Sequence, residues 1–276
     1  MSESLLPVPP NTLLNKKLCS SFLHGGSKTV LTRVNTITGV AYKDDPTIMA
    51  WELMNEPRCQ SDLSGRTLQS WIAEMAAHVK SIDAAHLLEA GLEGFYGAST
   101  PSRAAAANPS GYQLGTDFVA NNRAPGIDFA TVHAYPDQWL PGLDAPSQLR
   151  FLGAWLDAHV ADARDALRKP LLVAEFGRSR RDPGTSGDQQ RDAVFGTVYG
   201  RVYESARAGG PAAGALFWQL LAEGMESYGD GYEVVLGQAS STAGVIATQS
   251  RRLQGLARAF ARARKPKQGQ TGKGGN

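Results

Sequence analysis

The sequence predicts an α/β fold built around a parallel sheet. Short apolar runs that do not alternate with polar residues recur along the chain, and stretches with helical periodicity lie between them. Such alternation of strand and helix is typical of a parallel sheet. Several runs end in a charged or aromatic side chain, at the end of the strand where binding sites of these folds lie. The predicted strands cover residues 47–54, 87–92, 129–135, 171–176 and 214–220.

Helices are expected around these strands. Ahead of the first strand, residues 28–42 place Leu31, Val34 and Ile37 on one helical face, so the recognisable pattern begins on a helix. The other helical stretches lie between or after the strands. They cover residues 65–84, 147–168, 187–207 and 243–264.

Length and composition predict one soluble domain. The 276 residues, 42% of them hydrophobic, can bury a large core, and no apolar run approaches the roughly 18 residues of a membrane span. Eight basic and no acidic residues follow position 250, which leaves 20 basic against 26 acidic residues before it. The expected organisation is an unrelated or disordered segment at 1–27, the domain at 28–264, and a disordered basic tail at 265–276. Such a tail favours a solvated end over nucleic-acid binding.

Two glutamates stand out at strand ends. Glu56 closes the run Thr-Ile-Met-Ala-Trp-Glu-Leu-Met-Asn-Glu-Pro, and Glu175 lies in Leu-Val-Ala-Glu-Phe-Gly. Burying a carboxylate costs several kcal/mol or raises its pKa, so both are expected where a cleft begins. A pair of carboxylates at the ends of two buried strands suggests hydrolysis of sugar bonds.

Each candidate taken alone has an ordinary interpretation. A glutamate before a proline often stabilises a helix start, and a single histidine or tryptophan usually belongs to the core. Their joint placement at strand ends is what favours a site. Cys19 and Cys59 are forty positions apart, and no close pair of cysteines or histidines occurs, so no metal site is expected. A disulfide between the two cysteines is left open.

Long motifs in a fixed order identify a family. They include Trp-Glu-Leu-Met-Asn-Glu-Pro, Gly-Leu-Glu-Gly-Phe-Tyr-Gly and His-Ala-Tyr-Pro-Asp-Gln-Trp. With these motifs the chain resembles plant endo-β-1,4-mannanases of glycoside hydrolase family 5. The resemblance rests on residues 30–39, 42–59, 91–97, 129–139, 172–177, 217–225 and 230–234.

The resemblance implies roles for particular residues. Glu56 matches the acid/base and Glu175 the nucleophile of a retaining hydrolase, whose carboxyl groups lie roughly 5 to 5.5 Å apart. Asn55 matches the residue that bonds the sugar 2-hydroxyl. Tyr135 matches the phenol that contacts the nucleophile, and His133 borders the same subsite.

Aromatic residues complete the implied site. Trp218 matches a tryptophan whose face packs against the apolar side of a sugar ring, and Trp139 is expected to form a second platform. The implied substrate is a mannan-type polysaccharide, and no cofactor or metal is implied. The resemblance implies secretion to the cell wall, where family members are usually found, although residues 1–10 show no signal peptide.

The resemblance also implies a TIM (β/α)₈ barrel, with one departure. Only strands four to eight are recognisable, and strands one to three are expected to be missing. An arginine that the family places beside the nucleophile has no matching position. The outermost strands would then have open edges, which favours self-association or aggregation.

Three functions follow as alternatives. The first is endo-hydrolysis of β-1,4 bonds in mannan, galactomannan or glucomannan. The second is an inactive remnant that binds glycan weakly through Trp218, Trp139 and Tyr135. The third is a related β-1,4-glucanase, against which Tyr-Lys-Asp-Asp-Pro at 42–46 and Gly-Leu-Glu-Gly-Phe-Tyr-Gly at 91–97 favour the mannanase.

Overall fold

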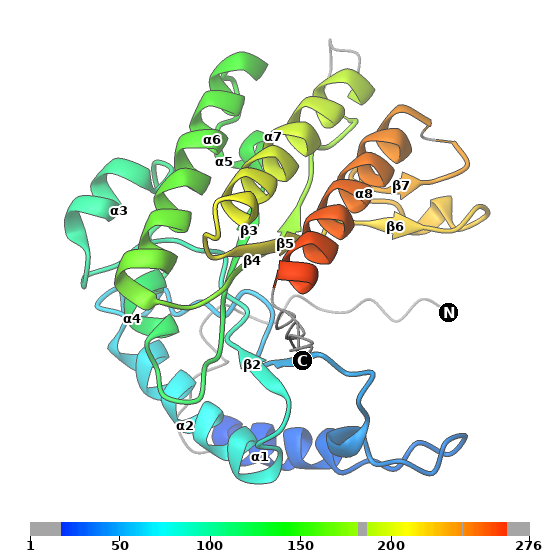
Figure 1. Ribbon diagram of the computed structural model, residues 1–276. Coiled ribbons are helices and arrows are strands. Elements are labelled where there is room, and N and C mark those ends of the chain that lie inside the picture. Colours follow the sequence, from blue (N-terminus) through cyan, green and yellow to red (C-terminus); the bar gives the residue numbers. More distant parts are fainter. Residues whose placement is uncertain (1–17, 182–186, 239, 264–276) are drawn as a thin grey trace, which may run out of the picture.

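The computed structural model of the chain describes residues 18–181, 187–238 and 240–263. Within these ranges the strands are parallel, and each lies beside its neighbour in the sequence (Figure 1). Two backbone bonds, from Asp128 N to Leu88 O at 2.8 Å and from His133 N to Glu93 O at 3.0 Å, continue the pairing from β2 to β3. The strands are β1 (Ala50–Glu52), β2 (Leu87–Glu89), β3 (Ala130–Ala134), β4 (Leu171–Phe176) and β5 (Ala212–Ala215). The predicted parallel sheet is therefore confirmed.

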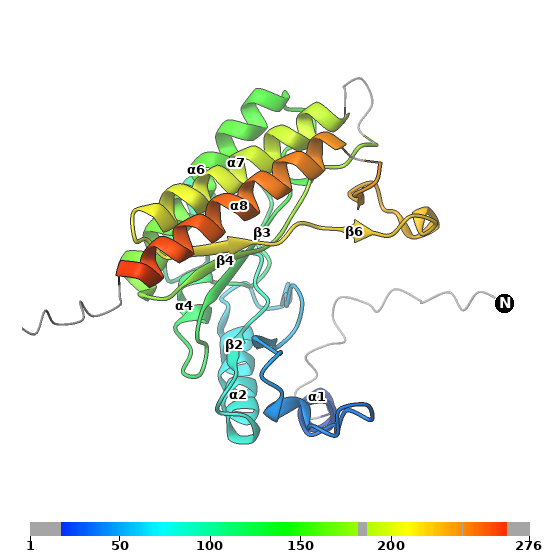
Figure 2. The same ribbon diagram turned by 45° about the vertical axis from the view of Figure 1, so that its right-hand side comes forward.

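The helices form two groups around the strands. Three long helices lie side by side over β3, β4 and β5, and another pair packs beside β1 and β2 (Figures 1 and 2). The first group is α6 (Ala145–Asp162), α7 (Gly187–Arg207) and α8 (Ser240–Ala263), and the second is α1 (Leu18–Leu31) and α2 (Arg66–Ile82). The predicted helices at 65–84, 147–168, 187–207 and 243–264 are confirmed. No described helix is both long and apolar enough to cross a membrane.

Shorter elements were not predicted. The strand expected at 214–220 ends early, and a separate parallel pair of short strands follows it. The backbone after β5 nonetheless continues to pair with β4, because Leu216 N donates to Val173 O and Trp218 N donates to Phe176 O, both at 2.9 Å. The additional elements are α3 (Pro101–Ala107), α4 (Phe118–Asn122), α5 (Pro136–Trp139), β6 (Leu220–Leu221) and β7 (Val234–Val235).

The helix predicted at 28–42 is wrong, because α1 ends at Leu31. In place of the expected helix, the side-chain oxygen of Asn35 accepts hydrogen bonds from the backbone of Ile37 at 2.8 Å and Thr38 at 3.3 Å, which makes a turn. Gly39 then takes a φ of 71°, which favours glycine. Ile37 is 93% exposed instead of lying on a buried face. Turn chemistry here overrides apolar periodicity.

The expected domain limits stay a prediction. Residues 18–27 of the segment expected at 1–27 are helical, as the first turns of α1. Residues 1–17 and the tail expected at 265–276 lie outside the described residues.

The core of the described residues falls into two clusters. One lies between β3–β5 and α6–α7 and includes Trp155, Phe176 and Phe195. The other lies between α2 and β1–β2 and includes Ile72 and Leu88, both fully buried. Each such side chain contributes about 1.5 to 3 kcal/mol by leaving water.

A hydrogen-bond network connects β1 to the C-terminal end of α2. Asp83, which caps α2, accepts hydrogen bonds at one oxygen from Trp51 Nε1 at 2.7 Å and from His86 Nδ1 at 2.6 Å. Its second oxygen accepts from the backbone of Ala85 and His86. His86 Nε2 faces the Asp45 carbonyl at 3.0 Å, so both ring nitrogens face acceptors. Burial opposes the charged ring, but Asp83 and Asp45 together outweigh it and raise the pKa of His86.

This network predicts a pH-dependent stability. A raised folded pKa means that the contribution of His86 is full below about pH 6.5 and is lost as pH rises through the folded pKa. The free energy of unfolding of His86→Gln should fall about 1 to 3 kcal/mol below wild type at pH 6, and less at pH 9. Urea titrations at both pH values measure this difference. A constant difference would contradict the charged state inferred for His86.

Candidate active site

Glu56 is placed by the loop that follows β1. Its backbone N–H donates to Gly91 O at 2.9 Å, which holds the loop against the loop after β2. Glu56 has a φ of 48°, a left-handed conformation that is uncommon for a residue with a side chain. Its carboxylate lies at the C-terminal end of the sheet, where catalytic groups of such folds are found.

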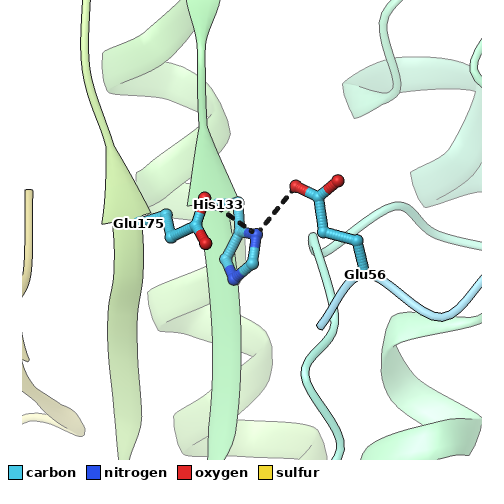
Figure 3. A group of neighbouring side chains, drawn as sticks. All are labelled: Glu56, His133 and Glu175. Carbon is cyan, nitrogen blue, oxygen red and sulfur yellow. Dashed lines mark hydrogen bonds and ion pairs between the residues drawn. The ribbon is translucent and has the colours of Figure 1, made fainter. Parts of the chain in front are cut away.

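His133 lies between the two predicted carboxylates (Figure 3). It belongs to β3, is 1% exposed, and pairs in register with Glu175 on β4. Its Nδ1 is 2.9 Å from Glu56 Oε1 and 3.7 Å from Glu175 Oε2. Because an ionised carboxylate can only accept, Nδ1 carries the hydrogen and donates it to Glu56. The structure thus brings together three residues that are distant in the sequence.

Arg58 and Glu93 support Glu56, and no role was predicted for either. Arg58 Nη2 lies 2.9 Å from Glu56 Oε2, and the same guanidinium binds both oxygens of Glu93 at 2.7 Å. Burial pushes the pKa of Glu56 upward, but the hydrogen bond from His133 and the charges of His133 and Arg58 hold it below its usual value. Burial raises the pKa of Glu93 in spite of Arg58.

Tyr135 orients the second carboxylate. Its hydroxyl donates to Glu175 Oε2 at 2.7 Å, the contact that the family resemblance implied. Burial, and then the bond to Glu175, raise the pKa of Tyr135, so the phenol stays a donor at neutral pH. Tyr232 packs edge-on against the Tyr135 ring, with centroids 5.3 Å apart.

A pocket of about 440 Å³ opens above these groups. Trp218 is 42% exposed on its wall, and its indole N–H donates to Asp230 Oδ2 at 2.7 Å, which fixes the ring. Asn55 is exposed and also lines this pocket. The pocket is lined by Asn55, Glu56, Arg58, Glu93, Tyr112, Tyr135, Gln138, Trp139, Glu175, Trp218, Asp230 and Tyr232.

Trp139 also borders the pocket but is only 6% exposed. Its ring packs against Trp155 at 4.9 Å and Phe95 at 5.6 Å between centroids. The role of second platform stays a prediction for this residue. Among the described residues, Glu56, His133 and Glu175 offer ligand atoms close enough to hold a metal ion.

Comparison with known proteins places the chain in a family. The family model described as "GH family 5 beta-mannosidase-like" matches residues 11–226. Mannan endo-1,4-beta-mannosidase 1 of Oryza sativa subsp. japonica is 74% identical over 237 residues, which are 86% of this chain and 55% of that protein. Mannan endo-1,4-beta-mannosidase 7 of Arabidopsis thaliana is 57% identical over 94% of this chain and 61% of its own length. The chain thus spans a little over half the length of these relatives.

Solved structures agree with the family match. The endo-beta-1,4-mannanase of Thermotoga petrophila superposes with a TM-score of 0.72 at 28% identity, over 88% of this chain and 52% of that one. The endo-1,4-beta-mannanase of Rhizomucor miehei gives 0.68 at 29% identity, over 89% and 64%. These similarities imply a fold of the TIM-barrel type. The chain therefore belongs to glycoside hydrolase family 5, with the beta-mannosidase-like members.

Proposed function

We propose that this chain carries the catalytic pair of an endo-β-1,4-mannanase that works by retaining double displacement. One observation supports this above others: oxygens of Glu56 and Glu175 and Nδ1 of His133 lie within 4.8 Å of one another beside an open pocket. Retaining enzymes hold their carboxyl groups roughly 5 to 5.5 Å apart, whereas inverting enzymes need roughly 6.5 Å or more. The relatives that are named as mannan endo-1,4-beta-mannosidases support mannan as the substrate.

In the first step Glu175 attacks the anomeric carbon as Glu56 gives a proton to the departing oxygen. The C–O bond to the leaving sugar breaks and a glycosyl ester forms on Glu175. Tyr135 holds the attacking carboxylate, while Trp218 offers its face to the sugar ring and Asn55 a side-chain amide to a hydroxyl. In the second step Glu56 takes a proton from water, which hydrolyses the ester.

A second candidate is glycan binding without turnover. The observation that favours it is the protonation state of Glu56, because His133 and Arg58 lower its pKa and keep it ionised. An ionised carboxylate has no proton to give, so this state suits the second step and not the first.

Release of reducing ends from soluble galactomannan by the purified chain tests the proposal. We expect release from galactomannan, little from cellulose, and none after Glu175→Ala. Equal release from cellulose would favour a β-1,4-glucanase. Background release by wild type, together with retained binding of mannan oligosaccharides, would favour the second candidate. Secretion to the cell wall stays a prediction.

Trp218 should act on substrate binding more than on chemistry. Trp218→Ala removes an exposed ring face from the pocket, so we expect KM for mannan oligosaccharides to rise roughly tenfold with a smaller change in kcat. Leu216→Ala, at a side chain that is 56% exposed two positions earlier, is the control. An unchanged KM for Trp218→Ala would remove the platform role.

We also propose that β1 to β5 correspond to strands four to eight of the barrel. In the described residues β1 pairs only with β2 and β5 only with β4, and Met49, next to β1, is 65% exposed. Open strand edges favour pairing with another chain.

Light scattering after gel filtration should therefore show species heavier than the 29.4 kDa monomer. Met49→Lys should reduce them, because a lysine beside an edge strand opposes edge-to-edge pairing. Leu63→Lys, at a side chain 53% exposed outside the strands, should not. A single monomeric peak for wild type would contradict the open edge as a contact.

A further inference from the structure

Three donor atoms converge at the centre of the site (Figure 3). They are Oε1 of Glu56, Nδ1 of His133 and Oε2 of Glu175, with Nδ1 at 2.9 Å from the first oxygen and 3.7 Å from the second. Two carboxylate oxygens thus lie close to one imidazole nitrogen. A mixed set of one nitrogen and two oxygens is a known ligand set for transition-metal ions.

The separations fit a metal ion. Ligand atoms bound about 2.1 Å from a common ion lie roughly 3.0 to 3.4 Å apart at right or tetrahedral angles. The two distances from Nδ1 bracket this range, and all the ligand atoms lie within 4.8 Å of one another. Binding an ion therefore needs only a small inward movement of the two carboxylates.

The donors are held in place by their neighbours. His133 is 1% exposed, and its backbone N–H is bonded to Glu93 O at 3.0 Å, so its ring has little freedom. Tyr135 holds Glu175 at 2.7 Å, and Arg58 holds the far oxygen of Glu56 at 2.9 Å. Supporting contacts of this kind strengthen metal binding by fixing the ligands before the ion arrives.

We propose that Glu56, His133 and Glu175 bind a late first-row divalent ion such as Zn²⁺. The ion takes the place of the hydrogen that Nδ1 shares with Glu56, and that proton leaves to solvent. Imidazole nitrogen favours Zn²⁺ or Cu²⁺, whereas Mg²⁺ and Ca²⁺ prefer sites made of oxygen alone. If the proposed hydrolysis is correct, the bound ion occupies both catalytic carboxylates and inhibits turnover; this consequence alone rests on the proposed function.

Titration calorimetry with Zn²⁺ tests the site without any measurement of activity. We expect one ion per chain, with an affinity that falls at least tenfold in Glu175→Gln and in Glu56→Gln, since each keeps the side-chain shape and removes a charged ligand. His133→Gln should do the same, but it changes a buried residue, so the glutamate variants decide. Mg²⁺ in place of Zn²⁺ should give no comparable binding.

A pair of histidines away from the proposed site provides the control. The rings of His24 and His78 are 4.3 Å apart, and His24 lies 3.4 Å from Glu74, so a variant here tests whether Zn²⁺ binds through these histidines instead. His78→Gln should leave the affinity unchanged. Zinc binding that is lost in His78→Gln and kept in Glu175→Gln would overturn the proposal.

The two proposals fail separately. A chain that binds Zn²⁺ through Glu56 and Glu175 but releases no sugar from galactomannan supports the metal site and removes the hydrolytic function. If the wild-type chain hydrolyses galactomannan but binds Zn²⁺ no more tightly than the Glu175→Gln variant, the proposed function stands and the metal site is overturned.

Discussion

Glu175→Ala is expected to lower kcat on galactomannan by roughly 10⁴-fold or more, with little change in the stability of the fold. The substitution removes the atom that would attack the anomeric carbon, and removing a nucleophile costs far more than removing a contact. Glu175 is not part of either hydrophobic cluster, so its loss leaves the core intact. Reducing-end assays and thermal melting of the same preparation measure the two effects.

Two additions sharpen this test. Glu204→Ala changes an exposed glutamate on α7 that pairs with Arg207 at 2.7 Å, and it should keep full activity. Azide added to Glu175→Ala can attack from the side that the carboxylate leaves vacant, which would give an α-mannosyl azide from an activated β-mannoside. Full activity of Glu175→Ala would assign the nucleophile elsewhere.

Gly91→Ala is expected to destabilise the chain by about 3 kcal/mol or more, or to prevent folding. A Cβ at this position would lie 1.9 Å from the carbonyl oxygen of Met54, and the φ of 81° already disfavours any side chain. Relief of the clash must move the backbone that leads to Glu56, whose N–H is bonded to Gly91 O. Urea denaturation of the variant measures the loss.

Gly142→Ala separates the steric clash from the cost of the positive φ. Gly142 has a similar φ of 89° but nothing within 4 Å of an added Cβ, so it carries the conformational cost alone. We expect about 1 to 2 kcal/mol for that cost. Equal losses of stability at Gly91 and Gly142 would show that the backbone around Met54 moves aside at no measurable cost.

Much of the fold could be predicted because its signals are local. A continuous apolar run such as residues 171–176 is what a strand buried on both faces requires, and β4 has these limits. The helix expected at 28–42 failed because the side chain of Asn35 offers the backbone an alternative partner, which an apolar pattern does not register.

The residues of the candidate site could likewise be predicted only in part. Glu56 and Glu175 could be predicted from the ends of their strands, and Tyr135 from the family resemblance. Arg58 was missed although it lies two positions after Glu56, because its role depends on Glu93, a partner 35 positions away.

The proposed metal-ligand cluster could not be predicted from the sequence, for a related reason. Ligand motifs are recognised by close spacing, whereas Glu56, His133 and Glu175 are separated by 77 and 42 positions and meet only through the order of the strands. Only a folded sheet shows such a cluster.

The division of the core into two clusters bears on how the site could come apart. Glu56 follows the strand that packs on α2, whereas His133 and Glu175 belong to the strands under α6 and α7. Regions with separate cores can open as separate cooperative units, which amide hydrogen exchange resolves. The bond between His133 and Glu56 joins one unit to the other. Partial unfolding of the α2 unit alone would thus separate Glu56 from Glu175 while most of the helical structure persists.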